Sequence, residues 1–195
     1  MADNKEYMFG PADIIIGEGE DQVAFDGENY LQAEGGTLTI TPQYTPINVI
    51  DFGETPIDNR LTGWDVQISV TAAQEDAKIL DVALASTTPI TNTDGGESGA
   101  MDAPIGSSPK GRRVRIHPRE LPDSIKERDW VIYKAASTEG FERNYGAEQG
   151  SITINLTAMP RDGFNASKPG NFFYRGAVDP NAEEDSGNDG ETPNQ

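Results

Sequence analysis

The side chains that most often perform chemistry are scarce in this chain, which has one histidine and no cysteine. His117 is followed by Pro118, which indicates a strand end or a turn. A catalytic triad would need a nucleophile and an orienting acid beside this histidine, and no nucleophile-elbow pattern is present. We therefore expect His117 to be structural or exposed, and we expect no catalytic residue, no metal site and no cofactor.

Two other patterns are poor candidates for a reactive site. Residues 17–19 read Gly-Glu-Gly, but the third glycine and the following helix of a phosphate loop are missing, and the neighbouring acids would repel phosphate. With 33 acids in the chain, a carboxylate pair for glycoside hydrolysis can be imagined almost anywhere. An enzyme that uses such a pair is therefore a hypothesis without a specific signal.

One group of residues is suited to ionic recognition. Five of the fifteen lysines and arginines fall within ten positions: Lys110, Arg112, Arg113, Arg115 and Arg119. A nucleic-acid-binding patch would combine such bases with aromatic side chains and a basic surround, and neither is near the cluster. We expect Arg112, Arg113 and Arg115 to pair with acids, inside the fold or on a neighbouring subunit. A solvated basic run without a partner is the alternative.

The net charge of −18 is spread unevenly along the chain. Residues 1–109 carry −16, residues 110–178 carry +4, and residues 179–195 carry −6. Such an acidic protein repels nucleic acid over most of its surface. The asymmetry also permits head-to-tail contacts in which the acidic face of one subunit meets the basic face of the next.

The elements that must position these groups are mostly strands. Residues 37–41 and 65–71 alternate polar and apolar side chains, which is typical of half-buried strands. Glycine and proline within residues 52–56 predict the turn of a long hairpin between them. Pro42 and Pro46 lie in its first arm, and proline is confined to edge strands, strand starts or bulges. We expect this arm to be bent or to lie at a sheet edge.

The spacing of apolar residues then changes to that of a helix. Four of them follow the second strand at helical intervals: Ala73, Ala77, Leu80 and Leu84. Thr71 and Gln74 fit a capping box, in which two free backbone amides at the helix start are satisfied by side chains. The sequence therefore predicts one short amphipathic helix that starts near Thr71.

Further strands are predicted at residues 13–16, 22–25, 114–117, 130–133 and 151–159. The fold class expected is mainly β, an antiparallel β-sandwich or barrel with one flanking α-helix. One domain is expected over residues 1–178, with a long flexible loop at about residues 88–111. Residues 179–195 lack aromatic and branched aliphatic side chains, which predicts a disordered acidic tail whose removal leaves fold and polymerisation intact.

The start of the chain carries no sign of a targeting segment. Residues 1–10 are polar and charged, and no run of about eighteen apolar residues occurs anywhere in the sequence. We therefore expect neither a secretory signal nor a membrane span, and a soluble protein that is made in the cytoplasm.

Several segments, in this order, resemble the major tail tube proteins of long-tailed, non-contractile (siphovirus-like) bacteriophages. The resemblance is carried by residues 9–17, 56–64, 114–118 with 129–135, and 150–154 with 158–163. Together these segments span most of the chain. The glycine-rich stretch at residues 88–111 and the acidic extension depart from the family pattern.

The resemblance implies a β-sandwich that assembles into hexameric rings, which stack into a tube in the virion tail. The tube would surround the tape measure protein, meet tail terminator and tip proteins, and later conduct DNA without binding it specifically. Subunits would be made in the cytoplasm of the host bacterium. Asp51, Glu54 and Asp58, around the turn of the long hairpin, are candidates for the lumen wall or for contacts with the next ring.

A carbohydrate- or ligand-binding β-sandwich module is the alternative function. Its stacking surfaces would come from five aromatic residues: Tyr30, Tyr44, Trp64, Trp130 and Tyr145. Most buried aromatic residues belong to a core, and the apolar run around Trp130 favours that role for it. An assembly assay separates the two functions, because only the tail subunit is expected to form rings or tubes.

Overall fold

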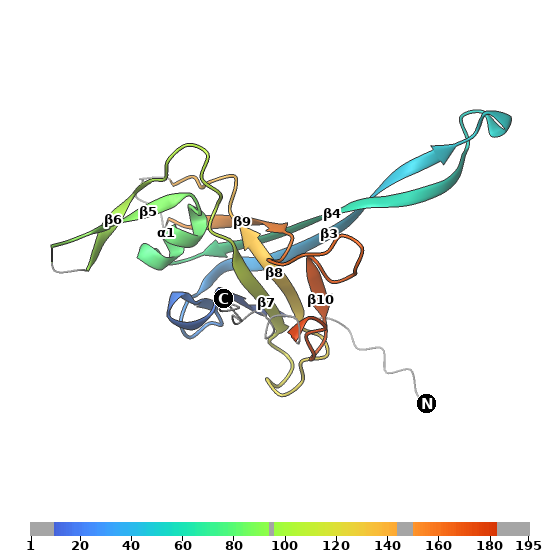
Figure 1. Cartoon of the computed structure of the whole chain (residues 1–195). Helices are drawn as coiled ribbons and strands as arrows, with labels where there is room; N and C mark the ends of the chain where they lie inside the picture. Colours follow the sequence, from blue (N-terminus) through green and yellow to red (C-terminus); the bar gives the residue numbers. More distant parts are fainter. Residues whose placement is uncertain (1–9, 94–95, 144–149, 183–195) are drawn as a thin grey trace, which may run out of the picture.

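The structure is a computed structural model that describes residues 10–93, 96–143 and 150–182 (Figure 1). Its elements, in chain order, are β1 (Ala12–Ile16), η1 (Gly19–Asp21), β2 (Val23–Phe25), β3 (Gln32–Asn48), η2 (Ile50–Phe52), β4 (Pro56–Ala72), α1 (Ala77–Ala83), β5 (Thr87–Thr91), β6 (Glu97–Asp102), β7 (Arg112–Pro118), β8 (Trp130–Ala136), β9 (Ile152–Met159) and β10 (Phe173–Arg175). The elements η1 and η2 are single turns of 3₁₀-helix. The prediction of a mainly β fold with one short helix is confirmed.

Eight of the strands form one antiparallel sheet in the order β2-β1-β7-β8-β9-β4-β3, with β10 paired to β8. Strands β5 and β6 form a separate two-stranded sheet. The large sheet does not close into a barrel by backbone pairing within the described residues. The sheet curls instead, so that the start of β3 lies against β1 and β2. There, the side-chain amide of Gln32 donates to Ala12 O at 2.7 Å and to Phe25 O at 2.9 Å.

One face of the sheet carries the core. Alternate residues of β4 and β9 are buried on this face, and Val70 lies opposite Ile154 in the register. Ile14 of β1 and Phe25 of β2 are also opposite one another and buried on the same face. The alternation of side chains along each strand therefore places the other face of the sheet toward solvent or toward the connecting loops.

The helix α1 covers part of the core but starts later than the sequence predicts. Residues up to Ala72 continue β4, and the Thr71 hydroxyl hydrogen-bonds to that of Thr153 at 3.1 Å rather than capping a helix. The helix is capped by Asp76, whose carboxylate accepts from the backbone amide of Ile79 at 2.8 Å. The predicted capping box is therefore wrong, because pairing with β9 extends the strand through the position of the expected cap.

The predicted apolar face of the helix is wrong except at Leu80, which packs against the core. The buried side chains of α1 are those of Ile79, Val82 and Ala83, whereas Ala77 is exposed and Leu84 retains 39% of its accessible surface. The shift follows from the later start, which rotates the face that meets the sheet.

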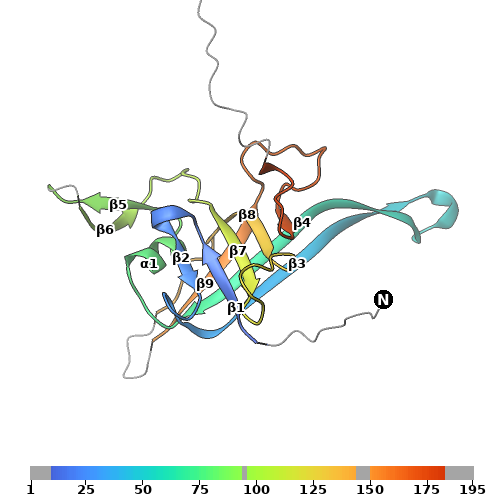
Figure 2. The ribbon, with the colours of Figure 1, turned by 90° about the horizontal axis from the view of Figure 1, so that it is seen from below.

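The long hairpin predicted from the alternating segments is confirmed. Strands β3 and β4 pair from Gln32 opposite Ala72 to Asn48 opposite Pro56, with a β-bulge after Gln43. Their outer part, residues 43–63, leaves the body of the molecule and is called the arm (Figures 1 and 2). Strand β3 is an edge strand of the sheet, which is where its two prolines are tolerated.

Two boundaries differ from the sequence predictions. The segment expected to be a long loop, residues 88–111, contains most of the β5–β6 hairpin. The acidic tail was expected to start at Asp179, but Asp179 is half-buried and Asn181 is 8% exposed. The remainder of that tail, residues 183–195, lies outside the described residues.

Gly36 is needed where the curled sheet closes on itself. A Cβ at this position would collide with Cδ1 of the buried Ile14, whereas a Cβ at the neighbouring Gly35 would meet no heavy atom within 4 Å. We expect Gly36→Ala to lower the free energy of unfolding by about 1–3 kcal/mol through overpacking. Gly35→Ala is the matched control, and urea denaturation of both variants tests the expectation. Equal stabilities would contradict it.

Candidate functional site

The tip of the arm exposes apolar side chains on a turn held by backbone bonds. In η2, the amide of Gly53 donates to Ile50 O at 3.2 Å, and Gly53 has a φ of +61°, which favours glycine. Ile50 retains 95% of its accessible surface, Phe52 66% and Ile57 52%. Clustered exposed apolar side chains of this size mark an interaction surface in a soluble protein.

The structure brings the three predicted acids to this same tip. Asp51 lies in η2, Glu54 in the turn and Asp58 near the start of β4, and all three are exposed. Their position at the end of the arm leaves both predicted roles, lumen wall or contact with another ring, as predictions. What the structure adds is that these acids share the tip with the exposed apolar side chains of η2.

The outer edge of β3 is a second candidate assembly surface. This strand has 17 residues and pairs only with β4 within the described part of the chain. Its other side therefore presents unpaired backbone donors and acceptors, which favour pairing with a strand of another chain.

The predicted basic cluster divides between the two faces of the sheet. Arg112 is 8% exposed and pairs with the Asp81 carboxylate of α1, and it also donates to Asp81 O at 3.2 Å. Lys110 lies 3.3 Å from the same carboxylate. Arg112 thus joins β7 to the helix inside the fold. Its pairing with a neighbouring subunit stays a prediction that this burial disfavours.

Arg113 lies on the opposite face, in a cluster that the sequence analysis missed. Its guanidinium donates to Asp179 at 2.8 Å and to the Tyr174 hydroxyl at 3.0 Å. Asp179 also accepts from the Tyr133 hydroxyl at 2.8 Å, and the Asn181 side chain donates to that hydroxyl at 2.8 Å. This cluster fixes the start of the predicted tail to strands β7 and β8.

The pKa values in this cluster follow from its contacts. Burial alone would raise the pKa of Asp179, but hydrogen bonds from the Asn181 amide, Tyr133 and Arg113 outweigh it and lower that pKa. Burial and the hydrogen bond to Asp179 raise the pKa of Tyr133. Asp179 is therefore held as a carboxylate, and Tyr133 as a neutral phenol that donates to it.

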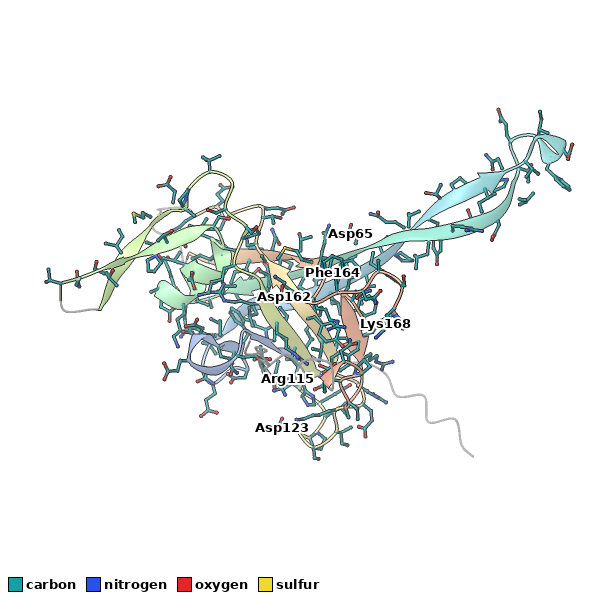
Figure 3. The ribbon with its side chains drawn as sticks, in the orientation of Figure 1. Asp65, Arg115, Asp123, Asp162, Phe164 and Lys168 are labelled. Carbon is teal, nitrogen blue, oxygen red and sulfur yellow. The ribbon has the colours of Figure 1, made fainter. Side chains whose placement is uncertain are left out.

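Arg115 lines a groove of about 470 Å³ between the β1–η1 turn, β8 and β10. Figure 3 shows this residue in the body of the molecule, away from the arm. Lys126, from the β7–β8 connection, and Arg113 also line the groove, so we call it the basic groove. Glu18 is its exposed acidic wall residue. The side chains of Arg115 and Lys126 make no hydrogen bond or ion pair with any residue that the structure describes.

His117 is buried beside this groove. It therefore has a structural role, which is one of the two roles that the sequence predicts for it. Its Nδ1 lies 2.5 Å from Asp129 Oδ1, and its Nε2 lies 3.1 Å from Leu121 O. Both neighbours are acceptors, so both ring nitrogens carry a proton in this arrangement and the ring is an imidazolium. Burial opposes the charged form, but the bonds to Asp129 and Leu121 outweigh it and raise the pKa of His117.

This raised pKa predicts a stability that depends on pH in one direction. The folded protein binds the proton of His117 more tightly than the unfolded chain does, so the full stabilisation is present below the unfolded pKa of about 6.5. The free energy of unfolding is expected to fall as pH rises through the folded pKa. Urea denaturation across this range, with NMR titration of the single histidine, measures the effect. A His117→Gln variant should lack this dependence, and retention of it would assign it to another group.

The aromatic residues expected of a carbohydrate site do not form one platform. Trp64 and Trp130 both contact Phe173, with ring centroids 5.3 Å and 5.9 Å apart. Tyr44 is exposed on the arm, and Tyr30 packs against the core and donates to Asp76. Tyr145, the fifth, lies outside the described residues.

Sequence spacing could not have revealed the clusters at Arg113 and His117. Their partners are 66 and 12 residues away in the chain, and the contacts depend on how β7, β8 and the C-terminal segment pack. Among the residues that the structure describes, no group of acidic, histidine or cysteine side chains could hold a metal ion. No helix in that part of the chain is long and apolar enough to cross a membrane.

Comparison with known proteins adds no relative to these observations. No protein-family model matches the chain. No curated protein matches it either. The arm, the open edge of β3 and the basic groove therefore carry the functional argument.

Proposed function

We propose that this protein is a structural subunit that self-assembles into stacked hexameric rings and forms the tail tube of a siphovirus-like bacteriophage. The tube would lie in the virion, surround the tape measure protein, end at terminator and tip proteins, and conduct the genome into the host. The proposal joins the resemblance of the sequence segments to the unpartnered surfaces of the fold. The observation that carries it is the open-edged hairpin β3–β4 with its projecting apolar tip.

The open edge supports ring formation for a physical reason. A 17-residue edge strand exposes a row of unpaired backbone groups, which promote uncontrolled association unless another strand covers them. Copies related by a rotation that closes cover one another's edges and leave none free. In this proposal, β3 of each subunit extends the sheet of its neighbour.

The arm supports contacts beyond the immediate edge. Between Gln43 and Asn48, β3 extends roughly 20 Å at about 3.3 Å per residue, and η2 lies beyond that. This part of the hairpin is largely exposed in the single chain. An element that long gains stability from tertiary contacts only when another molecule supplies them.

The outward face of β3, β4 and β9 supports the role of a conduit. Its side chains include Thr39, Gln67 and Thr157, which lie in register across the three strands. The charged residue of β4 beside them is the acid Asp65, which accepts from the Gln67 side chain at 3.2 Å and repels phosphate. A bore lined by this face would therefore not hold phosphates through ion pairing and counterion release. In our proposal this face, rather than the acids at the tip of the arm, lines the lumen.

Electron microscopy of the purified protein tests the proposal. We expect rings or stacked tubes, and we expect Ile50→Asp with Phe52→Asp to abolish them, because charge at the tip removes its apolar contact. Ile105→Asp is the matched control, since Ile105 is fully exposed on another loop. Wild-type protein that stays monomeric at every concentration, even with tail partners added, would contradict the proposal.

A further inference from the structure

The basic groove holds two cations that nothing in the described part of the chain neutralises. The side chains of Arg115 and Lys126 line it without a hydrogen bond or an ion pair to a described residue. Several other bases of the fold have acidic partners: Lys110 with Asp21, Arg119 with Asp13 and Lys134 with Asp162. In a chain with a net charge of −18, a pair of unneutralised cations in one groove indicates a site for an acidic partner.

The other charged residues that line the groove are either paired with another residue or exposed. Asp129 is bound to His117, and Arg113 is bound to Asp179. Glu18 remains, with a side chain that is 74% exposed and 3.7 Å from Arg113. The apolar part of the lining comes from β1 and β8 and from the Tyr174 ring of β10. A matching ligand therefore has carboxylates beside apolar side chains.

The tip of the arm has this composition. We propose that the basic groove receives the arm tip of a second copy of the chain, with Asp51 and Glu54 beside the two cations. The exposed apolar side chains of η2 then pack on the apolar part of the groove lining. This inference rests on the proposed function as a self-assembling subunit, and it names the surface that receives the arm.

The occupant has to come from another copy. In Figure 3 Arg115 lies in the body of the molecule, whereas the arm carries its tip far away from the body, so a chain cannot place its tip in its own groove. A contact between two different surfaces of identical chains is heterologous. Repeated from copy to copy, it generates a closed ring or a continuing stack, and both are required to build a tube.

Charge reversal on the two surfaces tests the inference. Arg115→Glu with Lys126→Glu, or Asp51→Lys with Glu54→Lys, is expected to raise the critical concentration for assembly about tenfold. Combining the two pairs should restore assembly toward the wild-type concentration, because opposite charges again face one another. Sedimentation and negative-stain microscopy measure the concentrations. Circular dichroism establishes that each variant is folded.

Two further variants make the test specific. Glu28→Lys with Asp102→Lys changes the net charge as much as the tip reversal does, at exposed positions away from the tip, from β3 and from the groove, and should leave the critical concentration unchanged. Glu18→Gln removes the acid of the groove that would repel the incoming tip, and should lower the critical concentration. The substitution is conservative and exposed, so it also serves if the reversed groove fails to fold.

The outcomes separate the inference from the proposed function. If the wild-type protein assembles and the reversed groove assembles at the same concentration, the docking site is wrong and the tube subunit stands. The inference is also overturned if the combined reversals assemble no better than either pair alone. A wild-type protein that never assembles overturns both.

Discussion

Replacing His117 by alanine is expected to lower the free energy of unfolding by about 3–5 kcal/mol, because the substitution leaves the Asp129 carboxylate buried without its cation. Asp129 is 2% exposed, so the carboxylate depends on His117 and not on bulk water for its stabilisation in the fold. Leu121 O loses the second hydrogen bond of the ring at the same time. Urea denaturation near pH 6, where the ring is charged in the wild type, measures the loss.

A double-mutant cycle separates this loss from a simple change of volume. Asp129→Asn with His117→Ala no longer buries an unpaired charge, so we expect it to be more stable than His117→Ala alone. Subtracting the costs of His117→Ala alone and of Asp129→Asn alone from the cost of the double variant gives the coupling between the two side chains. An ordinary surface substitution changes the free energy of unfolding by no more than about 1 kcal/mol. If His117→Ala lies within that range of the wild type, the pair contributes little.

Removing residues 179–195 is expected to destabilise the fold by about 3–5 kcal/mol, whereas removing residues 183–195 should have little effect. The longer deletion takes away Asp179 and Asn181, which leaves Arg113 without its buried acid and Tyr133 without both hydrogen-bond partners. The shorter deletion keeps all of these contacts. Thermal or urea unfolding of the two truncated chains measures the difference.

This expectation corrects the view that the whole acidic tail is dispensable. Composition identifies residues 179–195 as a segment without a core of its own, and that part of the reasoning is sound. It does not reveal that Asp179 is matched to Arg113, which lies 66 positions earlier. Asp179→Asn in the full chain is the point-substitution control. It keeps some hydrogen bonds and should cost less than the deletion, and equal costs would show that charge pairing dominates.

The parts of the fold that the sequence predicts are those with local signals. The alternating residues 37–41 and 65–71 define the long hairpin, and Pro42 and Pro46 place its first strand at an edge. The helix start was mispredicted because a capping pattern at Thr71 competes with strand pairing to β9, and pairing buries more apolar surface. The β5–β6 hairpin was missed because a stretch rich in glycine and serine lacks regular alternation.

The candidate site likewise has a part that the sequence predicts and a part that it does not. The three acids around the turn of the hairpin could be placed together from the sequence, because they are close in the chain. The basic groove could not, since Arg115 and Lys126 meet there only after β7 and β8 pair. The sequence shows that the basic residues are clustered. It is the strand, however, that places Arg112 and Arg113 on opposite faces, because successive side chains of a strand point to opposite sides.

The seam where the curled sheet meets itself has a mechanical consequence. Gln32 joins β3 to β1 and β2 through one side-chain amide, and the nearby contact of Gly36 with Ile14 is van der Waals in kind. Such a seam yields to a bending load before the backbone ladders on either side do. In the proposed tube, we therefore expect this seam to absorb curvature within each protomer, as a hinge line, so that the joints between protomers stay intact.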